Sequence, residues 1–413
     1  MNAISRRFFI LSALGVSLSC AMSSSSYARV ASSVLDNPTR NLFNFADFGG
    51  VPGAISDVLL AAFDAAFTKL KNLGGGVLLI PPGDYDLGSY AATSPVINIS
   101  DLNNVFISAY GARFQVTSSA AITPLLFCFR NPNNVVMAGA SFIDLGFDES
   151  AWLLHGRWGM YCVAVDSKTA CGNFRLVDCS ARNVTGLFTI DSRANKFKIR
   201  NVVIENCKVT NAYYGVDVLY HGDNLSVRNL ICEDVRRGFI SYGSKNVDVD
   251  IKLHCSANFF GSNGFISLAC EGASEGNVES VRIKLDVTGV ESHTALVHFY
   301  HQQRDSPGFF RKIDAQVNVN QLIAVGKNSK LEKLYLFLFD HELPDTSVLR
   351  ATSRIWDRIT LTGKVTGEIS GGVIAVPTKS NSRGVLVLDK DFYARSDLTV
   401  LSEKFVVRPL LLN

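Results

Sequence analysis

The middle of the chain is a succession of short segments in which apolar and polar residues alternate, as expected for β-strands. FRLVDC, VVIENC, LSVRNL, VDVDIKL and VRIKLDV are each followed, after a polar or Asn-containing turn, by a second strand-like segment. These second segments begin at Gly186, Gly215, Gly238, Gly264 and Ala295, at spacings of 29, 23, 26 and 31 residues. A unit of two or three strands that recurs at such an interval predicts a solenoid.

The expected fold is all-β, a right-handed parallel β-helix whose coils stack about 4.8 Å apart, so that equivalent residues form ladders along the axis. Cysteines recur in similar phrases at intervals of 28, 25 and 23 residues, at Cys179, Cys207, Cys232 and Cys255. They are predicted to form one inward ladder of free thiols. The chain has no CxxC pair or Cys/His finger spacing, so the cysteines give no support to a zinc site.

A short N-terminal helix is predicted to close the open end of this solenoid. It begins near Ser56 and has an apolar stripe at helical spacing: Leu59, Phe63, Ala66, Phe67 and Leu70. A strand and the turn Pro81-Pro82-Gly83 follow at once. The first coil of a solenoid needs such a cap, because it otherwise exposes bare strand edges.

The first 28 residues have the pattern of an export signal. Arg6 and Arg7 precede an apolar run from Phe8 to about Ser19, and small residues lead to Ala28. The run is short for a bilayer span. The string Ser5-Arg6-Arg7-Phe8-Phe9-Ile10 resembles a bacterial twin-arginine signal; an ordinary secretory leader is the alternative. Both predict a periplasmic or secreted protein without an integral membrane segment after the leader is removed.

The predicted organisation is a signal peptide at 1–28, a linker at 29–44, the β-helix at 45–390 and a C-terminal tail or cap at 391–413. Of the 413 residues, 47% are hydrophobic and 19% charged, which excludes an intrinsically disordered chain. The net charge of +3 falls to +1 without the two leader arginines, so a nucleic-acid partner is not expected. An acidic ligand must therefore be held by local cations.

The segment from about 45 to 90 resembles the opening of pectate-lyase-superfamily proteins. The matching residues are Phe48, Gly49, Gly75, Gly76, Pro82, Gly83 and Tyr85. The loop at 53–57 departs from the family pattern, since it has lost most of the acids. The resemblance implies a polysaccharide partner and a lyase, hydrolase, epimerase or phage tailspike; the leader argues against a tailspike. No cofactor is predicted, and the calcium that many pectate lyases use stays an open alternative.

Two repeated phrases place carboxylates one coil apart. Asp166 and Asp191 are 25 residues apart in Val-Asp-Ser-Lys and Ile-Asp-Ser-Arg, so their backbones are expected to stack at roughly 5 Å. Two carboxylates that close favour one proton between them, which makes them a candidate acid–base pair. Lys168 and Arg193 would neutralise the pair or hold an acidic sugar. The alternative is ordinary Asp-Ser turn chemistry.

The next coil resembles the Tyr-Gly-x-Asp-x-His signature of mannuronan C5-epimerases. Three positions match: Tyr214, Gly215 and Asp217. Leu219 occupies the histidine position, and His221 follows two residues later. The resemblance implies that tyrosine and histidine transfer protons while aspartate handles the substrate carboxylate. Arg236 and Arg237 are candidate cations for the charge that develops. The alternative is that the tyrosines pack and the arginines are solvated.

Alternation along the second segments separates inward from outward positions. Counting from each leading glycine, the outward positions are predicted to include Thr189, Asp191, Tyr220, Ser241, Ser267, His298 and Tyr300. Asp217 falls on the inward row, which requires either a bulge or a buried acid with internal partners. Tyr220, His298 and Tyr300 are therefore candidate substrate-binding residues.

The function predicted from these features is that of an exported enzyme that acts on an acidic or uronate-containing polysaccharide by proton abstraction, as a lyase or an epimerase. The Asn-x-Asp, Asp-Asp and Gly-His-Gly pattern of polygalacturonases is absent. A glycoside hydrolase on the same scaffold and a non-catalytic protein for glycan binding or exopolysaccharide biosynthesis are the alternatives.

Overall fold

The computed structural model describes sixteen segments of the chain: residues 41–90, 95–119, 125–146, 160–166, 171–191, 199–219, 222–256, 264–271, 277–290, 295–302, 309–323, 334–341, 354–366, 372–375, 383–393 and 405–410. The predicted leader lies outside them, as do Lys168, Arg193, Tyr220 and His221.

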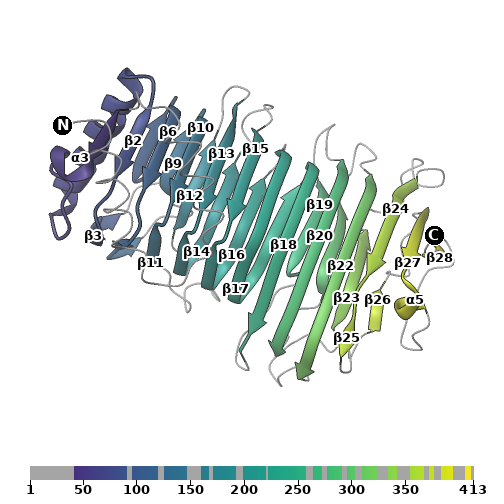
Figure 1. Cartoon of the computed structure of the whole chain (residues 1–413). Coiled ribbons are helices and arrows are strands. Elements are labelled where there is room, and N and C mark those ends of the chain that lie inside the picture. Colours follow the sequence, from purple (N-terminus) through teal and green to yellow (C-terminus); the bar gives the residue numbers. More distant parts are fainter. Residues whose placement is uncertain are drawn as a thin grey trace, which may run out of the picture.

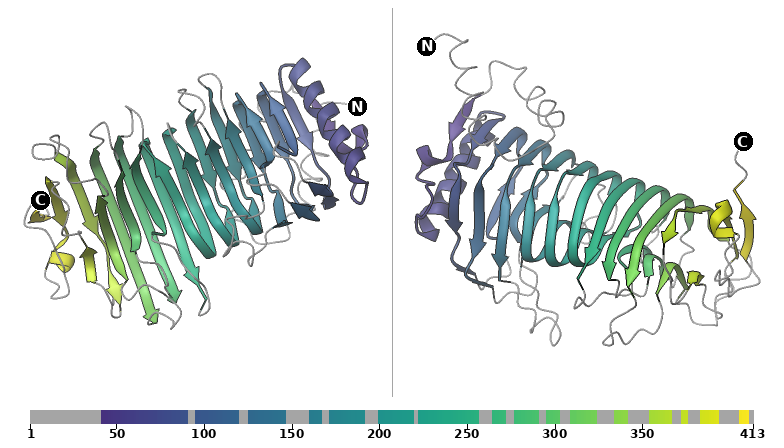
Figure 2. Two further views of the ribbon diagram at one scale, coloured as in Figure 1. Left: turned by 180° about the vertical axis from the view of Figure 1, so that it is seen from behind. Right: turned by 60° about the horizontal axis from the view of Figure 1, so that its bottom comes forward.

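The chain winds into a right-handed parallel β-helix, as predicted, in which strands of successive coils lie side by side (Figures 1 and 2). Among the described residues every strand pairing is parallel, and the pairings of the main sheet form three ladders along the axis. Each coil therefore contributes one strand, or one part of a long strand, to each ladder. Figure 2 shows the coils stacked from the N-terminal helix to the C-terminal end.

The first ladder starts at β1 (Leu42–Asn44) and contains the following strands: β2 (Gly76–Leu79), β6 (Asn103–Ser108), β10 (Asn133–Ala138), β13 (Cys171–Val177), β15 (Ile199–Glu205), the first parts of β17 (Gly222–Tyr242), β18 (Lys245–Cys255), β20 (Val278–Val290) and β22 (Phe310–Ile323), then β24 (Arg354–Thr362), β27 (Arg383–Leu388) and β28 (Phe405–Pro409).

The second ladder contains β3 (Gly83–Asp86), β7 (Ala112–Val116), β11 (Ser141–Leu145), the first parts of β14 (Ser180–Asp191) and β16 (Lys208–Leu219), the middle of β17, the ends of β18, β20 and β22, and β25 (Val365–Thr366). The third ladder contains β5 (Ile97–Ser100), β9 (Leu125–Arg130), β12 (Tyr161–Asp166), the last parts of β14, β16 and β17, then β19 (Ile266–Glu271), β21 (Ala295–Gln302), β23 (Tyr335–His341) and β26 (Gly372–Ala375). The short strands β4 (Ser89–Tyr90) and β8 (Ser118–Ser119) pair separately.

Asparagines recur near the start of each strand of the first ladder, because the backbone at that position adopts a positive φ. One aligned position has φ between 53° and 60° in nine coils: Asn104, Asn134, Asn173, Asn201, Asn224, Asn246, Ser280, Lys312 and Arg358. Asparagine tolerates this left-handed conformation better than most residues. Its amide also bonds to the preceding coil, as where Asn224 Nδ2 donates to Asn201 Oδ1 at 2.6 Å. The Asn-containing turns of the sequence thus mark bends within each coil.

The N-terminal cap is formed by η1 (Phe45–Phe48) and α3 (Ser56–Asn72), and a short helix, α5 (Lys390–Tyr393), lies near the other end (Figure 1). All five residues of the predicted α3 stripe are buried. Phe63 of this stripe packs against Phe45, Phe114 and Phe127, with ring centroids 4.3 to 6.2 Å apart. The capping helix therefore continues the core of the solenoid.

The predicted single cysteine ladder is wrong beyond its first pair. Cys179 and Cys207 lie on adjacent coils, because Ser180 pairs with Lys208 28 residues later. Cys232 instead pairs with Val209, since this coil advances 23 residues whereas Cys207 and Cys232 are 25 apart. The four side chains are buried and reduced, as expected. All four point into the core, but Cys232 lies two residues farther along its strand than Cys207.

Tyr85 is expected to make the fold sensitive to alkaline pH. Its side chain is fully buried, its hydroxyl donates to the Pro81 carbonyl at 2.8 Å, and burial raises its pKa from 10.0 to about 12. The folded chain keeps this proton at a pH where the unfolded chain has lost it, so stability should fall as pH rises from 10.0 to about 12. Melting temperatures across this range should fall less steeply for Tyr85→Phe, and identical slopes would contradict the assignment.

Candidate functional site

The outward side of the third ladder carries a row of buried polar residues. Phe188, Val216 and Phe239 are in register and belong to the core, so the residues that follow each of them point outward. The outward row is formed by Thr189, Asp217, Ile240, Ser267 and His298, each between 2% and 7% exposed. Buried polar groups of this kind require partners, which makes the row a candidate site.

This register corrects the predicted orientation of two residues. Gly186 pairs with Tyr214, not with Gly215, so counting from the leading glycines is one residue out in this coil. Asp217 therefore lies on the outward row without a bulge. Ser241, predicted outward, pairs with Val218 and is fully buried inside, where its hydroxyl lies 2.6 Å from the Ser244 hydroxyl.

Asp217 is held by a tyrosine that comes from two coils earlier. The Tyr161 hydroxyl donates to Asp217 Oδ2 at 2.6 Å, and the Tyr161 ring stacks on Tyr214 with centroids 5.7 Å apart and planes 22° apart. Gly186 lies between the two tyrosines in register. A Cβ atom there would lie 2.7 Å from the Tyr161 ring. The glycine thus leaves the space in which the two rings meet.

Gly186→Ala is expected to displace Tyr161 and to weaken its hydrogen bond to Asp217. Overpacking of this kind costs about 1–3 kcal/mol. The melting temperature should fall, and the fall should be smaller when the substitution is made in a Tyr161→Ala background, because the clash is then absent. Equal losses in the two backgrounds would show that Gly186 does not serve the tyrosine pair.

Arginines surround the same tyrosines. The guanidinium carbons of Arg236 and Arg237 each lie 5.8 Å from the centre of the Tyr213 ring, within the range of a cation–π contact. Tyr213 packs edge-on against Tyr214, with centroids 4.4 Å apart. The site therefore combines a carboxylate with two cations and three aromatic rings.

The electrostatics of this cluster keep Tyr214 protonated and Arg237 charged. Burial, followed by the negative charge of Asp217, raises the pKa of Tyr214 well above its usual value. Burial lowers the pKa of Arg237, but the nearby tyrosines and Asp217 outweigh burial and raise it overall. Tyr214 thus keeps its proton at neutral pH, and Arg237 is a cation placed beside it.

The carboxylates predicted to form a pair lie on the two coils before Asp217 in the same ladder, two residues farther along their strands than the outward row. Asp166 and Asp191 follow Val165 and Ile190, which are in register, so their backbones lie one coil apart as predicted. The Asp191 side chain lies outside the described residues. Asp166 Oδ2 is 3.7 Å from Nε of Arg130, a cation that sequence reasoning missed. The signal was its position at the end of the preceding strand LLFCFR, which aligns with Val-Asp.

His298 and Tyr300 lie on β21, three coils beyond Asp217. Their ring centroids are 5.5 Å apart, and Nε2 of His298 lies 3.6 Å from Oδ2 of Asp340. Sequence reasoning missed Asp340 because it comes from the region where the repeat blurs.

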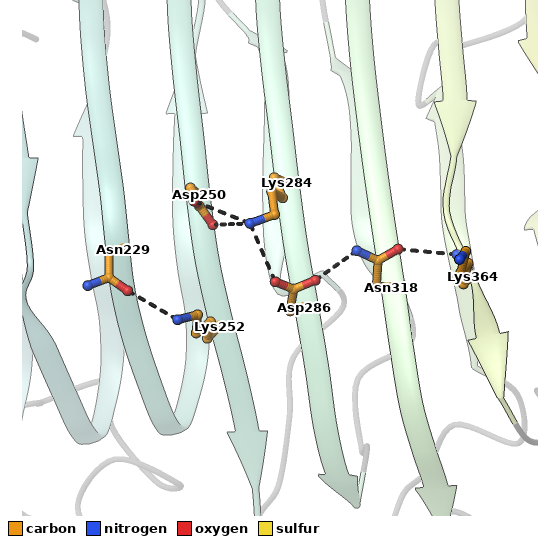
Figure 3. Close-up of polar contacts among 7 residues, drawn as sticks. All are labelled: Asn229, Asp250, Lys252, Lys284, Asp286, Asn318 and Lys364. Atoms are coloured by element: carbon orange, nitrogen blue, oxygen red, sulfur yellow. Dashed lines mark hydrogen bonds and ion pairs between the residues drawn. The ribbon is translucent and has the colours of Figure 1, made fainter.

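The outward sides of the first two ladders differ from this site, because charged side chains there pair with side chains of opposite charge. Lys284 bridges Asp250 and Asp286, at 3.4 and 3.6 Å, and Lys252 contacts Asn229 at 3.3 Å (Figure 3). Such exposed pairs contribute little stability but leave little net field. On the third ladder, by contrast, Arg236 and Arg237 face the aromatic ring of Tyr213.

Within the described residues, no three His, Cys, Asp or Glu side chains gather in a way that could hold a metal ion. No helix in the same part of the chain combines the length and apolar character needed to cross a membrane.

No protein-family model matches the chain. It is 27% identical over 298 residues to a probable rhamnogalacturonase B of Aspergillus terreus, a match that covers 66% of this chain and 53% of the relative, so the chain spans about half of that protein's length. Similar solved structures include the A-module of a mannuronan C-5 epimerase from Azotobacter vinelandii (11% identity, TM-score 0.41, covering 90% and 98% of the two chains). Another is the tailspike of E. coli bacteriophage HK620 in complex with a pentasaccharide (13% identity, TM-score 0.46, covering 91% and 67%).

Proposed function

We propose that the protein is an exported enzyme that acts on an acidic, uronate-containing polysaccharide at the third ladder, by proton abstraction of the lyase or epimerase kind. The observation that carries the proposal is the buried Tyr161–Asp217 hydrogen bond beside the protonated Tyr214 and the cationic Arg237. This group supplies a base, an acid and a positive charge, which are the three things that proton removal beside a carboxylate needs.

In the first step, Arg237 pairs with the uronate carboxylate. The proton on C5 of the sugar moves to the Tyr161 oxygen while the hydroxyl proton of Tyr161 moves to Asp217. The electrons of the C–H bond pass into the carboxylate, where the guanidinium stabilises the added charge.

In the second step, Tyr214 supplies a proton. In a lyase, the electrons form a C4–C5 double bond as the bond from C4 to the glycosidic oxygen breaks, and that oxygen takes the proton. In an epimerase, C5 takes the proton on its opposite face and no bond to oxygen breaks. Both reactions use the same residues, so the product decides between them.

A second candidate is glycoside hydrolysis, which the match to the probable rhamnogalacturonase favours. Asp191 and Asp217 are one coil and two residues apart, a backbone separation of about 8 Å that is comparable with the carboxyl separation in inverting glycosidases. This reaction would need both carboxylates and would leave Arg237 with a role in binding alone.

The test is incubation of the purified mature protein with a panel of uronate glycans in deuterium oxide. The proposal predicts either unsaturated ends that absorb in the ultraviolet or deuterium at C5 without chain shortening. New reducing ends without unsaturation would support hydrolysis instead. Binding of a glycan without any of these products would support the non-catalytic alternative.

Export is tested by replacing both leader arginines with lysine. Arg6→Lys/Arg7→Lys should keep the protein in the cytoplasm, because the twin-arginine receptor reads the two guanidinium groups as an address. Cell fractionation measures this, and unchanged export would favour the ordinary secretory leader.

A further inference from the structure

A second polar centre lies on the same outward row as Asp217. His298 follows Asp217 in that row after Ile240 and Ser267, which places it three coils, or about 14 Å, along the axis. The intervening residues are small or apolar and nearly fully buried. The two centres are therefore separate, and they are aligned on one side of the solenoid.

The second centre presents one hydrogen-bond donor and one acceptor that do not bond to each other. His298 is 7% exposed, and its Nε2 has no hydrogen-bond partner among the described residues. That atom lies 3.6 Å from Asp340 Oδ2, which is longer than a hydrogen bond. A hydroxyl group can accept from the imidazole and donate to the carboxylate at once. This pairing of roles suits a sugar hydroxyl.

The residues around His298 and Asp340 make this second centre suitable for a sugar ring. Tyr300 is the register partner of Asp340, and its ring centroid is 5.5 Å from that of His298. Gly264, on the neighbouring coil, makes room for the histidine, since a Cβ atom there would lie 2.4 Å from His298 Cβ. Aromatic side chains beside a donor and an acceptor are common in carbohydrate and other small-ligand sites.

We propose that His298, Tyr300 and Asp340 form a distal sugar subsite, so that the glycan lies along the helix axis and is selected for length. This inference rests on the proposed function for the identity of the glycan. Catalysis takes place at Asp217, and the distal subsite binds a sugar about 14 Å farther along the same chain. A disaccharide cannot reach both centres, whereas an octasaccharide can.

The experiment measures turnover of galacturonate and mannuronate disaccharides and octasaccharides by the wild type and by His298→Ala. The variant should raise KM for the octasaccharide about two- to tenfold, the value of a hydrogen bond between neutral groups, and leave kcat unchanged. Neither constant should change for the disaccharide. His298→Gln, whose amide can still donate, should restore part of the affinity.

His254→Ala is the matched control, because His254 lies on the second ladder and contacts Thr288 at 3.3 Å. Its KM should equal that of the wild type for both lengths. An unchanged octasaccharide KM in His298→Ala, or an equal loss for both lengths, would overturn the distal subsite.

The same oligosaccharides separate this inference from the proposed function through calorimetric binding. If the wild type binds the octasaccharide more tightly than the disaccharide and His298→Ala loses that difference, the subsite stands even without turnover. If the wild type binds neither length, the subsite is overturned as well.

Discussion

Asp217→Asn should lower kcat by about 10²-fold or more while glycan binding is retained, because proton transfer by a positioned side chain is worth about 10²–10⁴-fold. Asparagine keeps the volume of aspartate, and its carbonyl oxygen can still accept from the Tyr161 hydroxyl. It cannot take up the proton that Tyr161 must release. Steady-state kinetics on the glycan identified by the panel measure the effect, and the melting temperature checks the fold.

The matched control is Asp248→Asn, on the outward side of the first ladder between Ser226 and Arg282 in register. That variant should turn over like the wild type. Tyr161→Phe should also lower kcat, because it removes the group that receives the C5 proton. Wild-type turnover by Asp217→Asn would contradict the catalytic role of this carboxyl.

Phe114→Ala should destabilise the N-terminal coils by about 3–5 kcal/mol, the usual cost of deleting a large aromatic side chain from a core. The Phe114 ring is fully buried and lies between 5.3 and 6.2 Å from those of Phe63, Tyr85, Phe127 and Phe142. Its removal leaves a cavity between α3 and the second ladder. Chemical denaturation monitored by hydrogen exchange in the first coils measures the loss.

Phe106→Ala is the control for this prediction. Phe106 is 9% exposed and packs in a small outward cluster with Val77 and Val136, away from the main core. Its removal should cost less, because neighbouring side chains and water can fill the space more easily. Equal losses for the two variants would show that the aromatic cluster beneath α3 does not hold the cap.

The coil pattern and the cap could be predicted because each depends on the spacing of residues that are close together in the sequence. Apolar residues between Leu59 and Leu70 recur at helical spacing, and pairs of strand-like segments recur once in each coil. The register between coils could not be predicted, because it depends on the number of residues in each bend. Gly186 and Gly215 look equivalent in sequence, yet Gly186 pairs with Tyr214. One residue of offset reverses the side to which every later side chain is assigned.

Part of the candidate site was predicted because Tyr214, Asp217 and Arg237 lie on neighbouring coils within recognisable phrases. Tyr161 was missed, since it reaches Asp217 from two coils away across a glycine. Asp340 was missed for a similar reason, as its strand lies where the repeat is irregular. Contacts of this range depend on the register, and sequence spacing alone does not set them.

The most direct test of the central claim is a crystal structure of Asp217→Asn with a bound uronate oligosaccharide. The glycan should lie along the axis over the outward side of β14, β16 and β17, with a carboxylate on Arg237 and a sugar C5 facing the Tyr161 hydroxyl. A glycan bound instead on the ion-paired side of the first and second ladders, with Tyr161 and the substituted side chain untouched, would contradict the account.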